Sequence, residues 1–134
     1  MAERAEKRSF VGGFIRYWLP VLLYLTLIVT LSAQPGLRPP ARFDLTDKFY
    51  HTLEYFGLGL MIARAFRSGR RGTLPVLDMA MVVTLGLIVG ASDEIFQSYI
   101  PGRESDILDV LADTTGVLLA QVAYLVLALF RGRE

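Results

Sequence analysis

The chain has 134 residues, of which 53% are hydrophobic and 20% charged, and its formal net charge is +1. A charged fraction below the ~25% of soluble domains, together with long apolar runs, indicates a protein that is dissolved in a lipid bilayer. The small net charge argues against a nucleic-acid partner. The absence of cysteine excludes disulfide frameworks, thiolate metal sites and cysteine nucleophiles. This length allows one domain, expected over residues 1–134.

The first predicted membrane span covers residues 17–33, which carry no charge and begin with an aromatic pair, Tyr17 and Trp18, suited to the membrane interface. A basic leader before an apolar stretch is also the pattern of a signal peptide. Cleavage after Ala33 would place Leu31 where the signal peptidase requires a small residue. An uncleaved first helix is therefore the favoured interpretation.

Three further spans are predicted at about residues 48–66, 76–97 and 107–130. Gly- and Pro-containing segments at 34–40, at 68–75 and at Pro101-Gly102 separate them. The second span is the weakest, because its uncharged stretch covers only residues 55–63. A three-span arrangement, with the second segment lying on the membrane surface, is the alternative to the favoured four spans.

The distribution of Lys and Arg predicts the orientation of the helices. With four spans, ten of these residues lie on the side of both termini and four on the opposite side. The positive-inside rule then places both termini in the cytoplasm, whereas three spans would place the C-terminus outside. The predicted fold class is an all-α membrane protein, a compact bundle of four transmembrane helices with cytoplasmic N- and C-termini.

This topology brings polar residues of three helices to one depth near the outer face. Within each helix they recur at intervals of three or four residues, so each set forms one stripe. Eight of the thirteen acids lie in this layer or its adjoining loop, where only Lys48, Arg103 and His51 are cationic candidates. Crowded carboxylates cannot all ionise, so some must hold protons or share a cation. We expect a polar pocket open to the outer side, lined by Asp47, Lys48, His51, Glu54, Asp93, Glu94, Gln97, Arg103, Asp106, Asp109 and Asp113.

Small residues follow the same stripes, as Gly86-x-x-x-Gly90 and as Ala112-x-x-x-Gly116-x-x-x-Ala120, and predict close helix packing. Several polar residues also have structural interpretations. Two acids, Asp47 and Asp106, precede predicted helices and suit helix caps, and Arg103 suits an ion pair with Asp106 or Glu104. His51 alone is compatible with an interior structural histidine. Glu54 and Asp113 are predicted to lie deeper and to lack an assigned cation.

These residues carry a resemblance to the VanZ-like family of small bacterial integral membrane proteins. The resemblance covers about residues 17–130. It rests on Asp47-Lys-Phe-Tyr-His51 with Tyr55-Phe-Gly-Leu-Gly59, on Ser92-Asp-Glu94-x-x-Gln97-x-x-x-Pro101-Gly-Arg103, on Asp106-x-x-Asp109-x-x-x-Asp113-x-x-Gly116 and on Ser32-Ala-Gln-Pro35. Where this chain has Asp113, the family usually has Asn. The resemblance implies a multi-pass protein of the bacterial cytoplasmic (inner) membrane. It also implies a family association with the cell envelope and with resistance to the antibiotic teicoplanin.

Two functions from different classes fit the polar layer. The first is a non-enzymatic binding protein for an amphiphile in the bilayer, such as a lipid-linked precursor, a phospholipid or a lipopeptide, with Arg103 as the bidentate donor. The second is an intramembrane enzyme acting on a lipid-linked substrate. His51, Glu54, Asp93 and Glu94 would then serve as general acid–base groups or as oxygen and nitrogen ligands of a divalent metal. No known metal spacing is matched, so neither a metal nor another cofactor is predicted. A proton- or cation-coupled carrier is a third option, and four short helices would then require oligomerisation.

Overall fold

Four long helices make up the structure, a computed structural model that describes residues 2–35, 44–68, 75–103 and 105–131. They are α1 (Ala2–Ser32), α2 (Asp44–Arg67), α3 (Pro75–Gln97) and α4 (Ile107–Arg131). The described residues contain no strand. The predicted all-α class is therefore confirmed.

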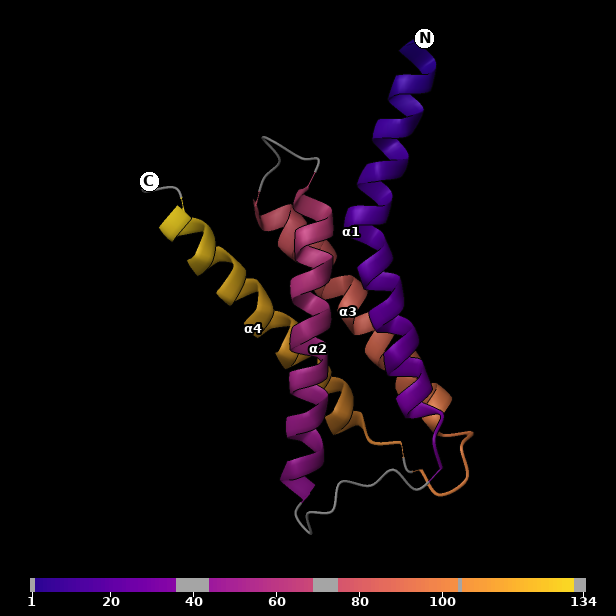
Figure 1. Cartoon of the computed structure of the whole chain (residues 1–134). Helices are drawn as coiled ribbons and strands as arrows, with labels where there is room; N and C mark the ends of the chain where they lie inside the picture. Colours follow the sequence, from indigo (N-terminus) through magenta and orange to yellow (C-terminus); the bar gives the residue numbers. More distant parts are fainter. Residues whose placement is uncertain (1, 36–43, 69–74, 104, 132–134) are drawn as a thin grey trace.

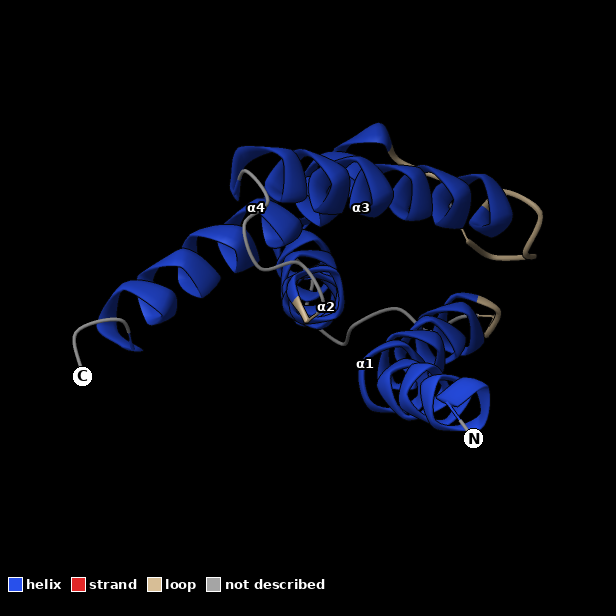
Figure 2. Ribbon diagram, turned by 90° about the horizontal axis from the view of Figure 1, so that it is seen from above, coloured by secondary structure: helices blue, strands red, loops and turns tan. Residues whose placement is uncertain are grey.

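The four helices alternate in direction, so that the start of α1 and the end of α4 lie at the same end of the bundle (Figure 1). Viewed from above, α2 lies in the middle (Figure 2). It packs against α1, α3 and α4, and its contact with α4 is the most extensive in the described part of the chain. This arrangement is the compact four-helix bundle that the sequence predicts.

Three of the helices contain segments long and apolar enough to cross a membrane: Val11–Ser32, Val76–Gln97 and Ile107–Leu127. They carry many large apolar side chains on the outside of the bundle, such as Leu23, Ile88 and Leu119. Exposure of such side chains to lipid tails costs no free energy, whereas their exposure to water is unfavourable. The central helix α2 does not reach the same hydropathy, because its charged and polar residues interrupt the apolar run.

Two helix starts differ from the sequence-based expectation. The first helix begins at Ala2 rather than near residue 17, because the charged residues before the apolar run are themselves good helix formers. The second helix begins at Asp44, so Asp47 lies inside its first turn and is not its cap. Most of the predicted loops at 34–40 and 68–75, and Glu104 with them, lie outside the described residues.

Small residues bring α2, α3 and α4 close together. A Cβ atom at Gly116 of α4 would meet the carbonyl oxygen of Thr52 and would lie 2.8 Å from the backbone nitrogen of Phe56, both on α2. A Cβ at Gly86 of α3 would lie 2.6 Å from a methyl group of Val117 on α4. The small-residue motifs therefore act as packing surfaces, as predicted.

Aromatic and basic side chains gather at the end of the bundle where Tyr17 and Trp18 of α1 pack against α2. The rings of Trp18 (α1) and Phe66 (α2) meet edge to face, with centroids 5.4 Å apart. The guanidinium of Arg64 lies 5.3 Å from the ring centroid of Tyr17, and that of Arg67 lies 4.3 Å from the ring centroid of Tyr124 on α4. Such a belt is typical of a membrane–water interface.

Candidate functional site

The opposite end of the bundle contains the polar layer, and one lysine joins two of its helices. The Lys48 ammonium on α2 donates to Asp106 Oδ2 and to Asp109 Oδ1, each at 2.7 Å. Asp106 also caps α4, because its Oδ1 accepts the Leu108 N–H at 2.9 Å. These hydrogen bonds, first that of Lys48, hold the pKa of the half-buried Asp106 below its ordinary value. The expectation that Arg103 pairs with Asp106 is wrong, because Lys48 occupies that carboxylate.

A second link between α2 and α4 is formed by His51 and Asp113. The Nδ1 atom of the imidazole lies 2.9 Å from Asp113 Oδ1. Asp113 is completely buried, and His51 is only 8% exposed. Asp113 therefore has His51 as a hydrogen-bond partner, which the sequence alone does not assign to it. The reason is the rotation of α2 about its axis, which hydropathy does not reveal.

The first helix also contributes to the layer. The Ser32 hydroxyl at the end of α1 donates to Asp93 Oδ2 at 2.8 Å, and the Gln97 side-chain amide donates to the same oxygen at 2.8 Å. All three residues are buried. Sequence analysis did not place Ser32 in the site, although it belongs to the Ser32-Ala-Gln-Pro35 segment of the family resemblance.

A tight turn after α3 positions Arg103. The Arg103 N–H donates to the Ile100 carbonyl at 3.1 Å, and Gly102 has φ +82°. Pro at the second position and Gly with positive φ at the third are the pattern of a type II turn. The Arg103 guanidinium then donates from Nη2 to the Leu31 carbonyl at the end of α1, at 3.0 Å. Among the described residues it forms no ion pair.

The two glutamates of the layer differ in surroundings. The carboxylate of Glu94 on α3 accepts the Asp106 N–H through Oε2 at 2.9 Å, and Glu94 is 3% exposed. Glu54 on α2 is half-buried, and its carboxylate is within electrostatic range of His51, Asp93, Asp113 and Arg103. The predicted residues of α2, α3 and α4 thus come together at one end of the bundle.

Several buried polar atoms of the layer have no hydrogen-bond partner among the described residues. They are Asp93 Oδ1, Glu94 Oε1, Asp113 Oδ2 and Arg103 Nε. Buried polar groups in proteins are nearly always paired, and an unpaired one costs ~1–3 kcal/mol or more when charged. The layer therefore has hydrogen-bonding capacity that the described residues do not use.

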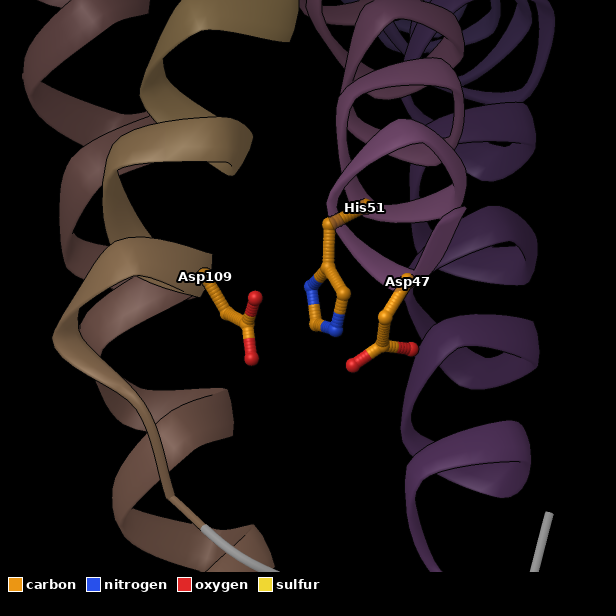
Figure 3. Close-up of side chains that lie close together, drawn as sticks. All are labelled: Asp47, His51 and Asp109. Carbon is orange, nitrogen blue, oxygen red and sulfur yellow. The ribbon is translucent and has the colours of Figure 1, made fainter. Parts of the chain in front are cut away.

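A different subset of the layer has the geometry of a metal site. One ligand atom each from Asp47, His51 and Asp109 lies within 4.8 Å of the other two. Figure 3 shows the imidazole ring between the two carboxylates. Sequence analysis did not predict this set, because Asp109 comes from another helix and only the packing of α2 on α4 adds it to the Asp47–His51 pair.

Comparison with known proteins places this architecture in a family. Residues 17–129, most of the chain, match the family described as VanZ/LLP1. The chain belongs to the VanZ/LLP1 family. The predicted family resemblance is therefore confirmed, and the apolar helices make the chain a VanZ-like membrane protein.

One relative of this VanZ-like protein comes from a yeast. An uncharacterized protein of Schizosaccharomyces pombe is 27% identical over 100 residues, which are 75% of this chain and 59% of that protein. The chain thus spans about three-fifths of the length of this relative. No solved structure matches the chain significantly.

Proposed function

We propose that this VanZ-like protein crosses the bacterial cytoplasmic membrane four times and binds the polar headgroup of an amphiphile in its polar layer at the outer face. The amphiphile would be a lipid-linked envelope precursor, a phospholipid or a lipopeptide antibiotic. The association of the VanZ-like family with teicoplanin resistance supports a ligand of the cell envelope.

The position of α2 supports four spans rather than three. Its 24 residues give a length of ~36 Å, enough to cross the ~30 Å hydrocarbon core. It lies between three apolar helices and is antiparallel to α1 and α3 (Figure 1). If α1 and α3 cross the bilayer, α2 crosses it with them, and its polar side chains are covered by protein instead of lipid.

The four-span topology predicts the activity of reporter fusions. Because both chain ends lie on the Lys- and Arg-rich side, alkaline phosphatase fused after Glu134 should be inactive, and green fluorescent protein fused there should fluoresce. The matched control is a phosphatase inserted after Tyr99, in the turn at the polar end, which should be active. An active C-terminal phosphatase would support three spans and contradict the proposal.

Helix geometry sets the depth of the polar layer. His51 and Arg64 are thirteen residues apart on α2, which is ~20 Å along the helix. If Arg64 and its aromatic neighbours lie at one interface of a ~30 Å core, His51 lies ~10 Å below the other. Polar groups at this depth are within reach of a lipid headgroup drawn slightly into the bilayer.

The observation that carries the binding proposal is the unused hydrogen-bonding capacity at the end of α3. Asp93 Oδ1 and Glu94 Oε1 are buried acceptors without a partner in the described part of the chain, and Arg103 Nε is a buried donor without one. An amine or hydroxyl group would satisfy the first two atoms, and a phosphate or carboxylate the third. Large apolar side chains of the same region, Tyr99 and Ile107, are 78% and 72% exposed and suit the apolar part of an amphiphile.

Exchange of arginine for lysine tests this proposal. Arg103→Lys keeps the charge but removes the Nε donor and the planar fork, so we expect binding to fall at least tenfold with normal amounts of folded protein. Binding is measured by native mass spectrometry in detergent with three separate probes: a polyprenyl phosphate, phosphatidylethanolamine and teicoplanin. Arg67→Lys is the matched control, because its charge lies over Tyr124 at the other end of the bundle.

The comparison of the two variants decides whether a probe binds at the proposed headgroup site. Binding of any one probe that falls with Arg103→Lys and not with Arg67→Lys supports the headgroup site and identifies its ligand class. Binding that is equal in both variants, or that only follows the amount of folded protein, contradicts it.

The second candidate function is an intramembrane enzyme acting on a lipid-linked substrate. The observation that favours it is the hydrogen bond from His51 to the buried Asp113, because a carboxylate behind an imidazole orients a general base. Turnover of a lipid-linked probe that is lost in His51→Gln and retained in Arg67→Lys would favour the enzyme over the binding protein.

A further inference from the structure

We propose that Asp47, His51 and Asp109 form a binding site for one divalent first-row transition metal ion, with Zn²⁺ as the ion to test first. The site is separate from the unpaired atoms at the end of α3 and does not depend on the headgroup proposal. The ligand set, one imidazole nitrogen and two carboxylate oxygens, is one that Zn²⁺ accepts.

The spacing of the three ligand atoms fits an ion after a small adjustment. Three atoms that lie within 4.8 Å of one another surround a point at most about 2.8 Å from each, and a Zn²⁺ ion requires ~2.0–2.2 Å. Shifts of less than about 1 Å in each of the three ligand atoms toward this point close the site. Three protein ligands leave a fourth position for an exogenous ligand.

The imidazole is already held as in a metal site. Its Nδ1 atom is engaged by Asp113 Oδ1 at 2.9 Å, and Asp113 is fully buried. Metal-binding histidines commonly donate their second ring N–H to such a carboxylate, which fixes the ring and leaves the other nitrogen free to coordinate. Asp113 is therefore a positioning residue in this proposal.

The remaining ring nitrogen of His51, Nε2, is free to coordinate a metal ion. The His51 side chain is 10% exposed, and its Nε2 atom forms no hydrogen bond with any described residue, whereas Nδ1 is engaged by Asp113. Figure 3 shows the ring nitrogen farther from the backbone directed toward the space beside the Asp47 carboxylate. Asp47 likewise has no hydrogen-bond or ion-pair partner for its carboxylate in the described part of the chain. Two unused ligand atoms thus face one another.

Lys48 competes for one of the ligands. It binds Asp109 through Oδ1 only, so Oδ2 remains available to a metal ion. A nearby ammonium weakens cation binding by repulsion. We therefore expect Lys48→Met to raise the Zn²⁺ affinity, a direction that no purely structural role of Lys48 predicts.

The experiment is a Zn²⁺ titration of the full chain in detergent, purified without a polyhistidine tag because His51 is its only histidine. Calorimetry should show one Zn²⁺ per chain. Asp47→Asn should weaken binding at least tenfold with little change in the melting temperature of the metal-free protein, because this carboxylate accepts no hydrogen bond from a described residue. Asp106→Asn is the matched control. Asp106 also binds Lys48 but lies outside the ligand triangle, so the Zn²⁺ affinity should not fall.

Replacement of Zn²⁺ by Co²⁺ provides a second, spectroscopic measurement of the site. Co²⁺ bound at one nitrogen and two oxygens should give visible absorption bands that disappear in Asp47→Asn and persist in Asp106→Asn. Absence of stoichiometric Zn²⁺ binding, or binding that is equal in Asp47→Asn and the unmodified protein, would overturn the proposal. Neither result would affect the Arg103 test, which uses no metal.

Discussion

Gly116→Ala is expected to reduce the stability of the folded bundle by about 3 kcal/mol or more, because a Cβ at this position enters the backbone of α2. The atoms in its way are the Thr52 carbonyl oxygen and the Phe56 nitrogen. Backbone atoms of a helix cannot rotate aside as a side chain can. The substitution therefore forces α2 and α4 apart along the most extensive helix contact of the bundle.

The measurement is thermal unfolding in detergent. The amount of monodisperse protein that remains after heating is determined by size-exclusion chromatography. Gly12→Ala is the control, since nothing lies within 4 Å of its added Cβ, and it should be neutral or slightly stabilising. Gly57→Ala should be intermediate, because its Cβ would meet only the hydroxyl end of Tyr24. Equal melting temperatures for all three variants would show that α2 and α4 do not approach as closely as described.

Asp113→Leu is expected to have the second large effect, a loss of ~3–5 kcal/mol in the free energy of unfolding. The substitution removes the acceptor of the His51 Nδ1 hydrogen bond and leaves a buried polar group unpaired. Asp113→Asn keeps an acceptor oxygen at the same place. It should cost only ~1 kcal/mol.

A double substitution distinguishes the loss of the His51–Asp113 hydrogen bond from the general effect of a leucine at position 113. His51→Leu combined with Asp113→Leu removes both polar partners, and should be more stable than Asp113→Leu alone. All variants are compared by melting temperature in the same detergent, without added metal. If the Asp113→Leu variant has the same melting temperature as the unmodified protein, the His51–Asp113 hydrogen bond does not contribute to stability.

The number and order of the helices could be predicted because the signals are local. Long apolar runs and Pro- or Gly-containing breaks fix where helices lie, and alternation of direction then brings the starts of α2 and α4 to the end of α3. The layer containing His51, Glu94 and Asp109 follows from that alternation alone. A pocket open to the outer side stays a prediction.

The pairing within the layer could not be predicted, because it depends on helix rotation and on side-chain reach. Lys48 and Arg103 are both cations close to Asp106 in the predicted layer, and only the packing shows that the lysine takes this carboxylate. Arg103 instead reaches the Leu31 carbonyl, at a helix end where a cation is favoured. The contribution of α1 through Ser32 was missed for a similar reason, since a single serine at the end of an apolar run has no distinctive pattern.

The central position of α2 has a consequence for how the protein is assembled during synthesis. A segment with Lys48, His51 and Glu54 enters lipid poorly by itself, since a charged residue costs ~2.5–3.5 kcal/mol at the centre of a membrane helix. Its main partner, α4, leaves the ribosome after α1, α2 and α3. Residues that bond α2 to α4, such as His51 and Asp113, are 62 positions apart in the chain. In the proposed four-span topology, stable integration of α2 therefore waits for α4. A nascent chain stopped before residue 107 should then keep this segment accessible to water-soluble labelling reagents.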